Sequence, residues 1–210
     1  MGLLEDISSF LQQGRAPIVK EKVQEALDQG LAPQEILEKG LLNGMGIIGD
    51  KFKKNEIFVP EVLIAARAMN AGVGILKPHL VEAGVESKGT AVIGTVKGDL
   101  HDIGKNLVKM MLEGKGLNVI DLGVDVSSEQ FVQAAIDNNA DVICCSALLT
   151  TTMGEMKNVV AAAEEKGIRD KVKIMVGGAP ITQSFCDSIG ADRYEPDAAS
   201  AADSALAFCS

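Results

Sequence analysis

The side chains best suited to chemistry lie in one short segment of the sequence. The chain has two histidines, His79 and His101, and Asp99 stands two residues before His101 in the segment 96–108, VKGDLHDIGKNLV. A carboxylate beside an imidazole can hold one ring nitrogen protonated and leave the other free as a base or a metal ligand. His79 has no acidic or cysteine partner at ligand spacing, so we expect it to be exposed.

The same segment does not fit the common phosphate-binding motifs. Gly98 and Gly104 are separated by five residues where a P-loop has four, and Asn106 stands where Ser or Thr is required. Asp99 and Asp102 would also repel phosphate oxygens. An Asp-x-His pair alone is most often a surface hydrogen bond, so its interpretation depends on the elements around it.

Those elements follow an alternating pattern from residue 89 onward. Apolar, β-rich runs alternate with helical patterns, and strands without a polar face indicate a parallel sheet covered by helices on each side. The predicted strands are 90–96, 118–124, 141–146, 172–178 and a short one at 192–194. In such sheets ligands bind beyond the carboxyl ends of the strands, where the strand order reverses. The predicted site loops are 97–104, 146–152 and 177–182.

Residues 1–88 have a different pattern, typical of amphipathic helices that begin near prolines. The predicted helices are 2–13, 17–29, 33–52 and 60–82. Short connections between them favour a bundle, and the last helix is apolar around nearly its whole circumference, which indicates burial on several sides. We therefore predict an α/β protein with a four-helix bundle at 1–88 and a Rossmann-like (flavodoxin-like), doubly wound parallel sheet domain at 89–210.

Composition excludes several classes of partner. With 20 Lys and Arg against 29 Asp and Glu, the net charge is −9, so we expect no nucleic-acid partner. No uninterrupted apolar stretch approaches the ~18 residues of a membrane span, and the acidic start MGLLEDISSF is unlike a secretory signal. We expect a cytoplasmic protein with reduced cysteines, of which Cys144 and Cys145 should lie buried in a strand.

Three motifs together resemble a known ligand fingerprint. They are Asp99-x-His101-x-x-Gly104, Ser146-x-Leu148 and Gly177-Gly178, with 41 residues between the first two and 28 between the last two. This set is similar to the cobalamin-binding fingerprint of the methionine synthase class, and the helical pattern before it resembles the cap domain that accompanies that fold. A chain of this length most resembles the small corrinoid carrier proteins of anaerobic methyltransferase systems.

The resemblance implies a cofactor and roles for individual residues. Cobalamin or a related corrinoid would cycle between methylcobalamin and Co(I) cobalamin, with His101 as the metal ligand. Asp99 and Thr152 would complete a hydrogen-bonded relay, where methionine synthases have serine at the position of Thr152. Further cofactor-binding residues would be Gly98, Asp102, Ile103, Gly104, Ser146, Leu148, Thr150, Gly177 and Gly178.

Two peripheral contacts are implied as well. Phe58, Val62 and Met69, which lie on roughly the same helix face, are candidates to cover the upper face of the corrin. The alternative for all three is the core of the bundle, and the sequence favours it for Val62 and Met69. The family position also places Tyr194, Pro196 and Asp197 near the far end of the nucleotide tail.

The implied function is transport of a methyl group on cobalt. One substrate-specific methyltransferase would load it from a methylamine, from a methyl ether by O-demethylation, or from methanol. A corrinoid:tetrahydrofolate or corrinoid:coenzyme M methyltransferase would unload it, and a reductive activase would restore Co(I). The chain would be a corrinoid subunit that is not catalytic on its own. The alternatives are a cobalamin-dependent sensor or regulator, the small subunit of a cobalamin mutase, and a flavodoxin-like module without cobalamin.

Overall fold

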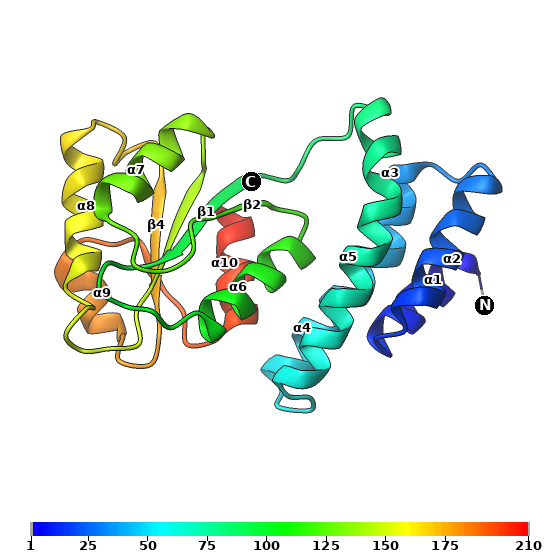
Figure 1. The fold of residues 1–210 in the computed structure, drawn as a ribbon, viewed down its shortest axis with the longest axis horizontal. Helices are drawn as coiled ribbons and strands as arrows, with labels where there is room; N and C mark the ends of the chain where they lie inside the picture. Colours follow the sequence, from blue (N-terminus) through cyan, green and yellow to red (C-terminus); the bar gives the residue numbers. More distant parts are fainter. Residues whose placement is uncertain (1, 210) are drawn as a thin grey trace. The chain divides into compact units, whose positions relative to one another are not determined.

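The computed structural model describes residues 2–209 and contains two compact units (Figure 1). The first extends to Ser87 and the second begins at Lys88, except that Gly114–Gly116 group with the first. The first unit is entirely helical, and the second contains a parallel sheet.

Three helices of the helical unit begin with a proline in their first turn. Its elements are α1 (Leu3–Gln12), α2 (Ala16–Asp28), α3 (Pro33–Glu35), the π-helical η1 (Ile36–Leu42), α4 (Asn43–Lys53) and α5 (Val59–Glu82). Pro17, Pro33 and Pro60 stand in the first turn of α2, α3 and α5, where the missing N–H costs nothing. The predicted bundle is confirmed, and α3, η1 and α4 together form its third helix.

The π-helical turn changes which side chains face the core. A regular helix over 33–52 would place Leu37 on the buried stripe with Leu41, Met45 and Ile48. In the structure Ile36 is fully buried instead, while Leu37 is only half-buried. The wider turn adds a residue to the repeat and so rotates the preceding part of the stripe.

Helix α5 is the core helix of this unit. Among residues 2–209 it alone has the length and composition that would allow a membrane crossing, a property shared by core helices of soluble proteins. It packs mainly against α2, and a Cβ added at Gly72 would press on Leu41 and Val19. Val62 and Met69 are buried. These two are therefore core side chains, which is the alternative that the sequence favoured for them.

The second unit has a five-stranded parallel sheet with the order β2-β1-β3-β4-β5. The strands are β1 (Thr90–Thr95), β2 (Asn118–Asp121), β3 (Val142–Ser146), β4 (Lys173–Gly177) and β5 (Arg193–Tyr194). The helices are α6 (Ile103–Gly114), α7 (Ser128–Asp137), α8 (Glu155–Glu165), α9 (Gln183–Ile189) and α10 (Ala198–Phe208). Figure 1 shows α7, α8 and α9 on one face and α6 and α10 on the other.

This arrangement confirms the predicted Rossmann-like fold class. The side chains that fill one face include Val92 and Ile143 from the central strands and Phe131 and Met156 from the covering helices, all fully or almost fully buried. From β1 the chain runs to β2 on one side and then crosses back to β3 on the other side of β1, so the strand order reverses between β1 and β3. The loops after these two strands consequently diverge and leave room for a ligand.

Candidate functional site

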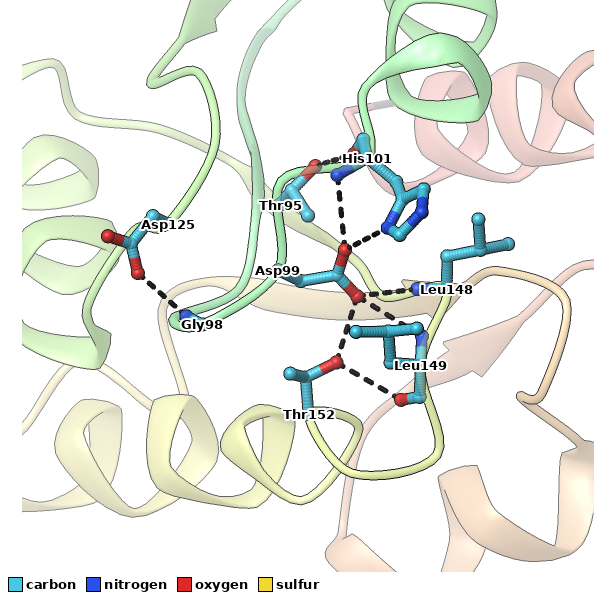
Figure 2. Close-up of polar contacts among 8 residues, drawn as sticks. All are labelled: Thr95, Gly98, Asp99, His101, Asp125, Leu148, Leu149 and Thr152. Carbon is cyan, nitrogen blue, oxygen red and sulfur yellow. Dashed lines mark hydrogen bonds and ion pairs between the residues drawn. The ribbon is translucent and has the colours of Figure 1, made fainter.

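Asp99 is a buried carboxylate at the centre of the site, just beyond the end of β1 (Figure 2). Its Oδ1 accepts hydrogen bonds from the backbone N–H of His101 at 3.1 Å and from Nδ1 of the same residue at 2.7 Å. Its Oδ2 accepts from the backbone N–H groups of Leu148 at 2.8 Å and Leu149 at 3.2 Å. The hydroxyl of Thr152 donates to the same oxygen at 2.8 Å. One carboxylate thus joins the loop after β1 to the loop after β3.

Two opposing effects set the pKa of Asp99. Burial alone raises this pKa, because it disfavours the charged form. The hydrogen bonds from His101, Leu148 and Thr152 favour the ionised form and outweigh burial, so the pKa lies well below its usual range. Asp99 is therefore an ionised acceptor near neutral pH, and Nδ1 of His101 carries the hydrogen that joins them.

His101 presents its two ring nitrogens in different directions. Nδ1 is bound to Asp99, and Figure 2 shows the second nitrogen, Nε2, turned away from the carboxylate. The side chain is 51% exposed, and no residue in the described range 2–209 forms a hydrogen bond with Nε2. With Nδ1 protonated, Nε2 of the neutral ring has a free lone pair, the arrangement found in metal-binding histidines.

Thr152 reaches Asp99 from a turn, not from a helix. Helix α8 begins only at Glu155, and the backbone N–H of Thr152 donates to Leu149 O at 3.2 Å. Its hydroxyl oxygen lies 2.8 Å from Asp99 Oδ2 and 3.1 Å from Leu149 O. Since a hydroxyl has one hydrogen, the shorter contact to the charged carboxylate is the stronger bond.

Two of the predicted glycines are required by the backbone itself. Gly98 has φ +80° and Gly178 has φ +129°, conformations that side chains disfavour. A Cβ at Gly178 would also overlap the carbonyl oxygen of Ala147.

Gly104 and Gly177 have no such reason to be glycine. A Cβ at Gly104 would meet nothing within 4 Å, and one at Gly177 would meet only Glu195 O at 3.9 Å. Neither residue has a positive φ. A helix normally loses stability through a glycine such as Gly104, so the open space beside both residues suits the close approach of a ligand.

The remaining predicted residues divide into two groups. Ile103 and Leu148 are exposed apolar side chains, as are Leu100 and Leu149, which no sequence motif marked as site residues. The second group is polar: Ser146 is partly buried, Thr150 is exposed, and Asp102 accepts from the Asn106 side chain at 3.1 Å.

The residues expected at the periphery of the site differ in their exposure and contacts. Phe58, at the N-cap of α5, is 65% exposed. Asp197 caps α10 by accepting from Ser200 N at 2.8 Å, while Tyr194 packs on the core of the sheet unit and Pro196 is exposed.

His79 and the two neighbouring cysteines are placed as the sequence predicts. His79 is exposed. Cys144 and Cys145 are buried, and burial raises the pKa of the Cys144 thiol to about 12, so this thiol is not a reactive nucleophile.

Sequence reasoning missed an ion pair that anchors α6. Lys105 is only 3% exposed, and its Nζ lies 2.6 Å from Asp121 Oδ1. Burial raises the pKa of Asp121, but Lys105, Lys109 and the Gly123 N–H outweigh it and lower that pKa. The pair ties the start of α6 to the end of β2, and no local pattern in the sequence reveals it.

Two further residues that were missed hold the loop of Asp99 and His101. Asp125, with φ +55°, accepts from Gly98 N at 2.7 Å and donates its own N–H to Asp99 O at 3.0 Å. Thr95 is fully buried, and its hydroxyl donates to His101 O at 2.8 Å. Both side-chain contacts are drawn in Figure 2, and they fix the loop from β1 and from the loop after β2. In the sequence, Thr95 stands out as a polar residue at the end of an apolar strand, and this could have marked it as a residue of the site.

Comparison with known proteins decides the family. A B12 binding domain matches residues 89–203, and a second B12 binding domain matches residues 3–77. The chain belongs to this B12-binding family. Its cofactor is cobalamin or a related corrinoid.

The relatives of this corrinoid protein match over nearly the whole chain. A dimethylamine corrinoid protein of Methanosarcina barkeri is 45% identical over 200 residues, which are 95% of this chain and 93% of the relative. A trimethylamine corrinoid protein of Methanosarcina acetivorans is 46% identical over 179 residues, 84% of this chain and 83% of the relative. A corrinoid protein of Desulfitobacterium hafniense is 42% identical over 197 residues, 92% of this chain and 91% of the relative.

Solved structures agree with this assignment. A chain of the methanol:cobalamin methyltransferase complex of Methanosarcina barkeri matches with a TM-score of 0.89 and 33% identity, covering 99% of this chain and 79% of that one. A cobalamin-binding protein of Desulfitobacterium hafniense matches with a TM-score of 0.80 and 28% identity, covering 98% of each chain.

The residues of this corrinoid protein fit the cofactor. Nε2 of His101 has no partner in the described chain, and Gly104 and Gly177 leave open space on two of the site elements. No group of three or more His, Cys, Asp or Glu side chains in residues 2–209 is arranged to hold a bare metal ion. A corrin provides the equatorial nitrogen ligands of cobalt itself, so a single imidazole is sufficient.

Proposed function

We propose that this corrinoid protein carries a methyl group on cobalt between two methyltransferases. The observation that carries the proposal is the half-exposed imidazole of His101, whose Nδ1 is held by buried Asp99 while Nε2 has no partner within the described chain. The names of its relatives, which refer to dimethylamine, trimethylamine and methanol systems, support the methyl-donor class. The bound corrinoid supplies a nucleophilic cobalt that can take up a methyl group and release it again.

His101 would bind the cobalt through Nε2 in this proposal. Asp99 keeps the hydrogen on Nδ1 and orients the ring, and its negative charge makes the imidazole a stronger ligand. The hydroxyl of Thr152 and the N–H groups of Leu148 and Leu149 keep that carboxylate ionised and immobile. Asp99 and Thr152 therefore act through His101 and do not themselves touch the metal.

The rest of the site would hold the corrinoid by shape. The slot for the nucleotide tail would be lined by residues at the carboxyl ends of three neighbouring strands and just beyond them. These are Gly104 in the first turn of α6, Ser146 at the end of β3, Leu148 and Thr150 in the loop after it, and Gly177 at the end of β4. The exposed side chains of Leu100, Ile103 and Leu149, together with Leu148, offer aliphatic surface to the ring. We also propose Phe58, an exposed side chain of the helical unit, as a corrin-binding residue.

The proposal also covers partners and location. One methyltransferase specific for a methylamine, a methyl ether or methanol would load the carrier, and another would pass the methyl group to tetrahydrofolate or coenzyme M. A reductive activase would restore the reduced cobalt after oxidation. We place these steps in the cytoplasm, and we propose that neither a nucleic acid nor a membrane takes part in them.

Reconstitution with cobalamin tests the central step. The purified protein and its His101→Ala variant are loaded with hydroxocobalamin, and corrinoid content and absorbance are recorded. We expect about one corrinoid per chain and a spectrum of histidine-ligated cobalt that the variant lacks. A wild-type protein that retains no corrinoid after gel filtration would refute the proposal.

The transfer itself is tested by chemical methylation. The loaded protein is reduced, treated with methyl iodide, and then mixed with methyltransferases of the methylamine, methanol and methyl-ether classes in separate assays. We expect uptake of methyl from methyl iodide and turnover with one of these classes. Uptake without turnover by any of them would favour a sensor or regulator instead.

A further inference from the structure

His101 lies in a stretch that regular secondary structure does not hold. The strand β1 ends at Thr95 and α6 begins at Ile103, so neither strand nor helix hydrogen bonds fix the backbone of His101. The first hydrogen bond of α6 runs from Asn106 N to Asp102 O, one residue after the histidine. Other groups must therefore determine where this imidazole stands.

Two side chains replace the missing backbone partners of His101. Its N–H donates to Asp99 Oδ1 at 3.1 Å, and its carbonyl oxygen accepts from Thr95 Oγ1 at 2.8 Å. The peptide groups on both sides of the histidine Cα are thus held. The remaining freedom is rotation of the ring, and the Nδ1 contact to Asp99 at 2.7 Å restricts that as well.

Thr95 is suited to this task because it belongs to the rigid centre of the sheet. It is fully buried, it pairs with Ser146 of β3, and its backbone N–H donates to Gly123 O at 2.9 Å. Because the backbone of Thr95 is held on both sides, its hydroxyl can fix the position of the loop that carries His101.

We propose that Thr95 is a positioning residue for the cobalt ligand. Its hydroxyl holds the His101 carbonyl and so fixes the backbone from which Nε2 would bind the cobalt. This inference rests on the proposed role of His101 as the cobalt ligand. Asp99 already holds the imidazole ring and the backbone N–H of His101, and Thr95 adds a separate contact to its backbone carbonyl.

The test compares four variants loaded with cobalamin in the Co(II) state. Thr95→Val keeps the shape and removes the donor, Thr95→Ser keeps the donor, and His101→Ala defines the spectrum without the histidine ligand. Thr90→Val is the matched control, because Thr90 begins the same strand and none of the side-chain hydrogen bonds of the described chain involves its hydroxyl. The readouts are the electron paramagnetic resonance splitting from the histidine nitrogen and the absorbance spectrum, beside thermal unfolding of each apoprotein.

We expect Thr95→Val to bind corrinoid but to shift toward the His101→Ala spectrum. The equilibrium constant for histidine ligation should fall about tenfold, the effect of one lost hydrogen bond. Thr95→Ser should restore the wild-type spectrum, and Thr90→Val should retain it. A wild-type spectrum in Thr95→Val, with His101→Ala clearly different, would refute the role of Thr95 and leave that of His101 intact.

Two further outcomes would also overturn the inference. If His101→Ala has the wild-type spectrum, the histidine is not the ligand and the roles of both residues fall together. If Thr95→Val does not fold, Thr95→Ala replaces it as a smaller variant that cannot overpack the site. Failure of both to fold would show that Thr95 stabilises the domain and does not specifically position the ligand.

Discussion

At the scale of single residues, the site depends on how completely Asp99 is satisfied. Both of its oxygens accept hydrogen bonds, from His101 on one side and from Leu148, Leu149 and Thr152 on the other. A buried charge without such partners would cost several kcal/mol. The same contacts that orient the imidazole therefore make the buried carboxylate tolerable.

Replacing this carboxylate should have a pH-dependent effect on stability. For the apoprotein, we expect Asp99→Asn to lower the free energy of unfolding at pH 7 by about 3 kcal/mol, because donors on both loops lose an ionised acceptor. The pKa of Asp99 is depressed in the folded protein, so its contribution is complete above its unfolded pKa of about 3.9 and is lost as the pH falls further. Urea unfolding between about pH 2.5 and 7 measures the difference in the free energy of unfolding between the wild type and Asp99→Asn.

The control for this experiment is Asp102→Asn, since Asp102 is exposed and, among residues 2–209, its side chain forms a hydrogen bond with Asn106 alone. That variant should remain close to wild type at every pH. A stability gap for Asp99→Asn that persists unchanged below about pH 4 would contradict the depressed pKa.

The neighbouring glycines Gly177 and Gly178 should respond differently to the same added methyl group. Gly178→Ala should destabilise the apoprotein by about 3 kcal/mol, because its φ is +129° and a Cβ would overlap Ala147 O. A Cβ at Gly177 would occupy open space, so Gly177→Ala should leave the melting temperature nearly unchanged. It should weaken corrinoid binding, because the added methyl group would fill space that the ligand needs. Thermal melts and corrinoid titration of both variants check this contrast, and equal effects on stability would disprove it.

At the scale of elements, α6 carries the loop of His101 and is anchored at several points. Lys105 joins it to Asp121 at the end of β2, and Asp125 and Thr95 hold the loop before it. A glycine near its start is unfavourable for a helix, yet Gly104 stands there, and a Cβ added to it would meet no atom within 4 Å. Helix α6 is therefore less stable at Gly104, the position where we expect the ligand to approach it.

The exchange Gly104→Ala should therefore separate stability from binding. We expect the apoprotein to gain about 0.5 kcal/mol from the better helix former, and corrinoid affinity to fall about tenfold because the methyl group enters the slot. Gly46→Ala is the matched control, since Gly46 lies in α4 and also has nothing within 4 Å. It should gain stability without loss of affinity. Unchanged corrinoid affinity in Gly104→Ala would remove this residue from the proposed slot.

At the scale of the whole molecule, corrinoid binding and folding should be linked. A ligand that binds only the folded chain stabilises it by about 2.7 kcal/mol at a concentration about 100-fold above Kd. We expect the melting temperature to rise with corrinoid concentration, and to rise less in Gly177→Ala at equal concentration. Calorimetry over a range of cobalamin concentrations measures this, and a concentration-independent melting temperature would argue against binding to the folded state.

The sequence by itself determined the fold class and the order of elements, because apolar periodicity and proline placement are local properties. It also indicated Asp99, His101 and Thr152, which the structure joins by hydrogen bonds. Only the tertiary structure decided that Val62 and Met69 are core side chains. Their burial depends on which helices pack together, and that cannot be read from a single helix.

The partners of the site loop were likewise decided by the tertiary structure. Thr95, Asp125 and the pair of Lys105 with Asp121 hold the segment that carries His101 through contacts between separate strands and loops. The π-helical turn at η1 also departs from the regular period on which the sequence prediction relied. Local patterns specify which elements form, whereas the contacts that fix a ligand in place arise where elements distant in the sequence meet.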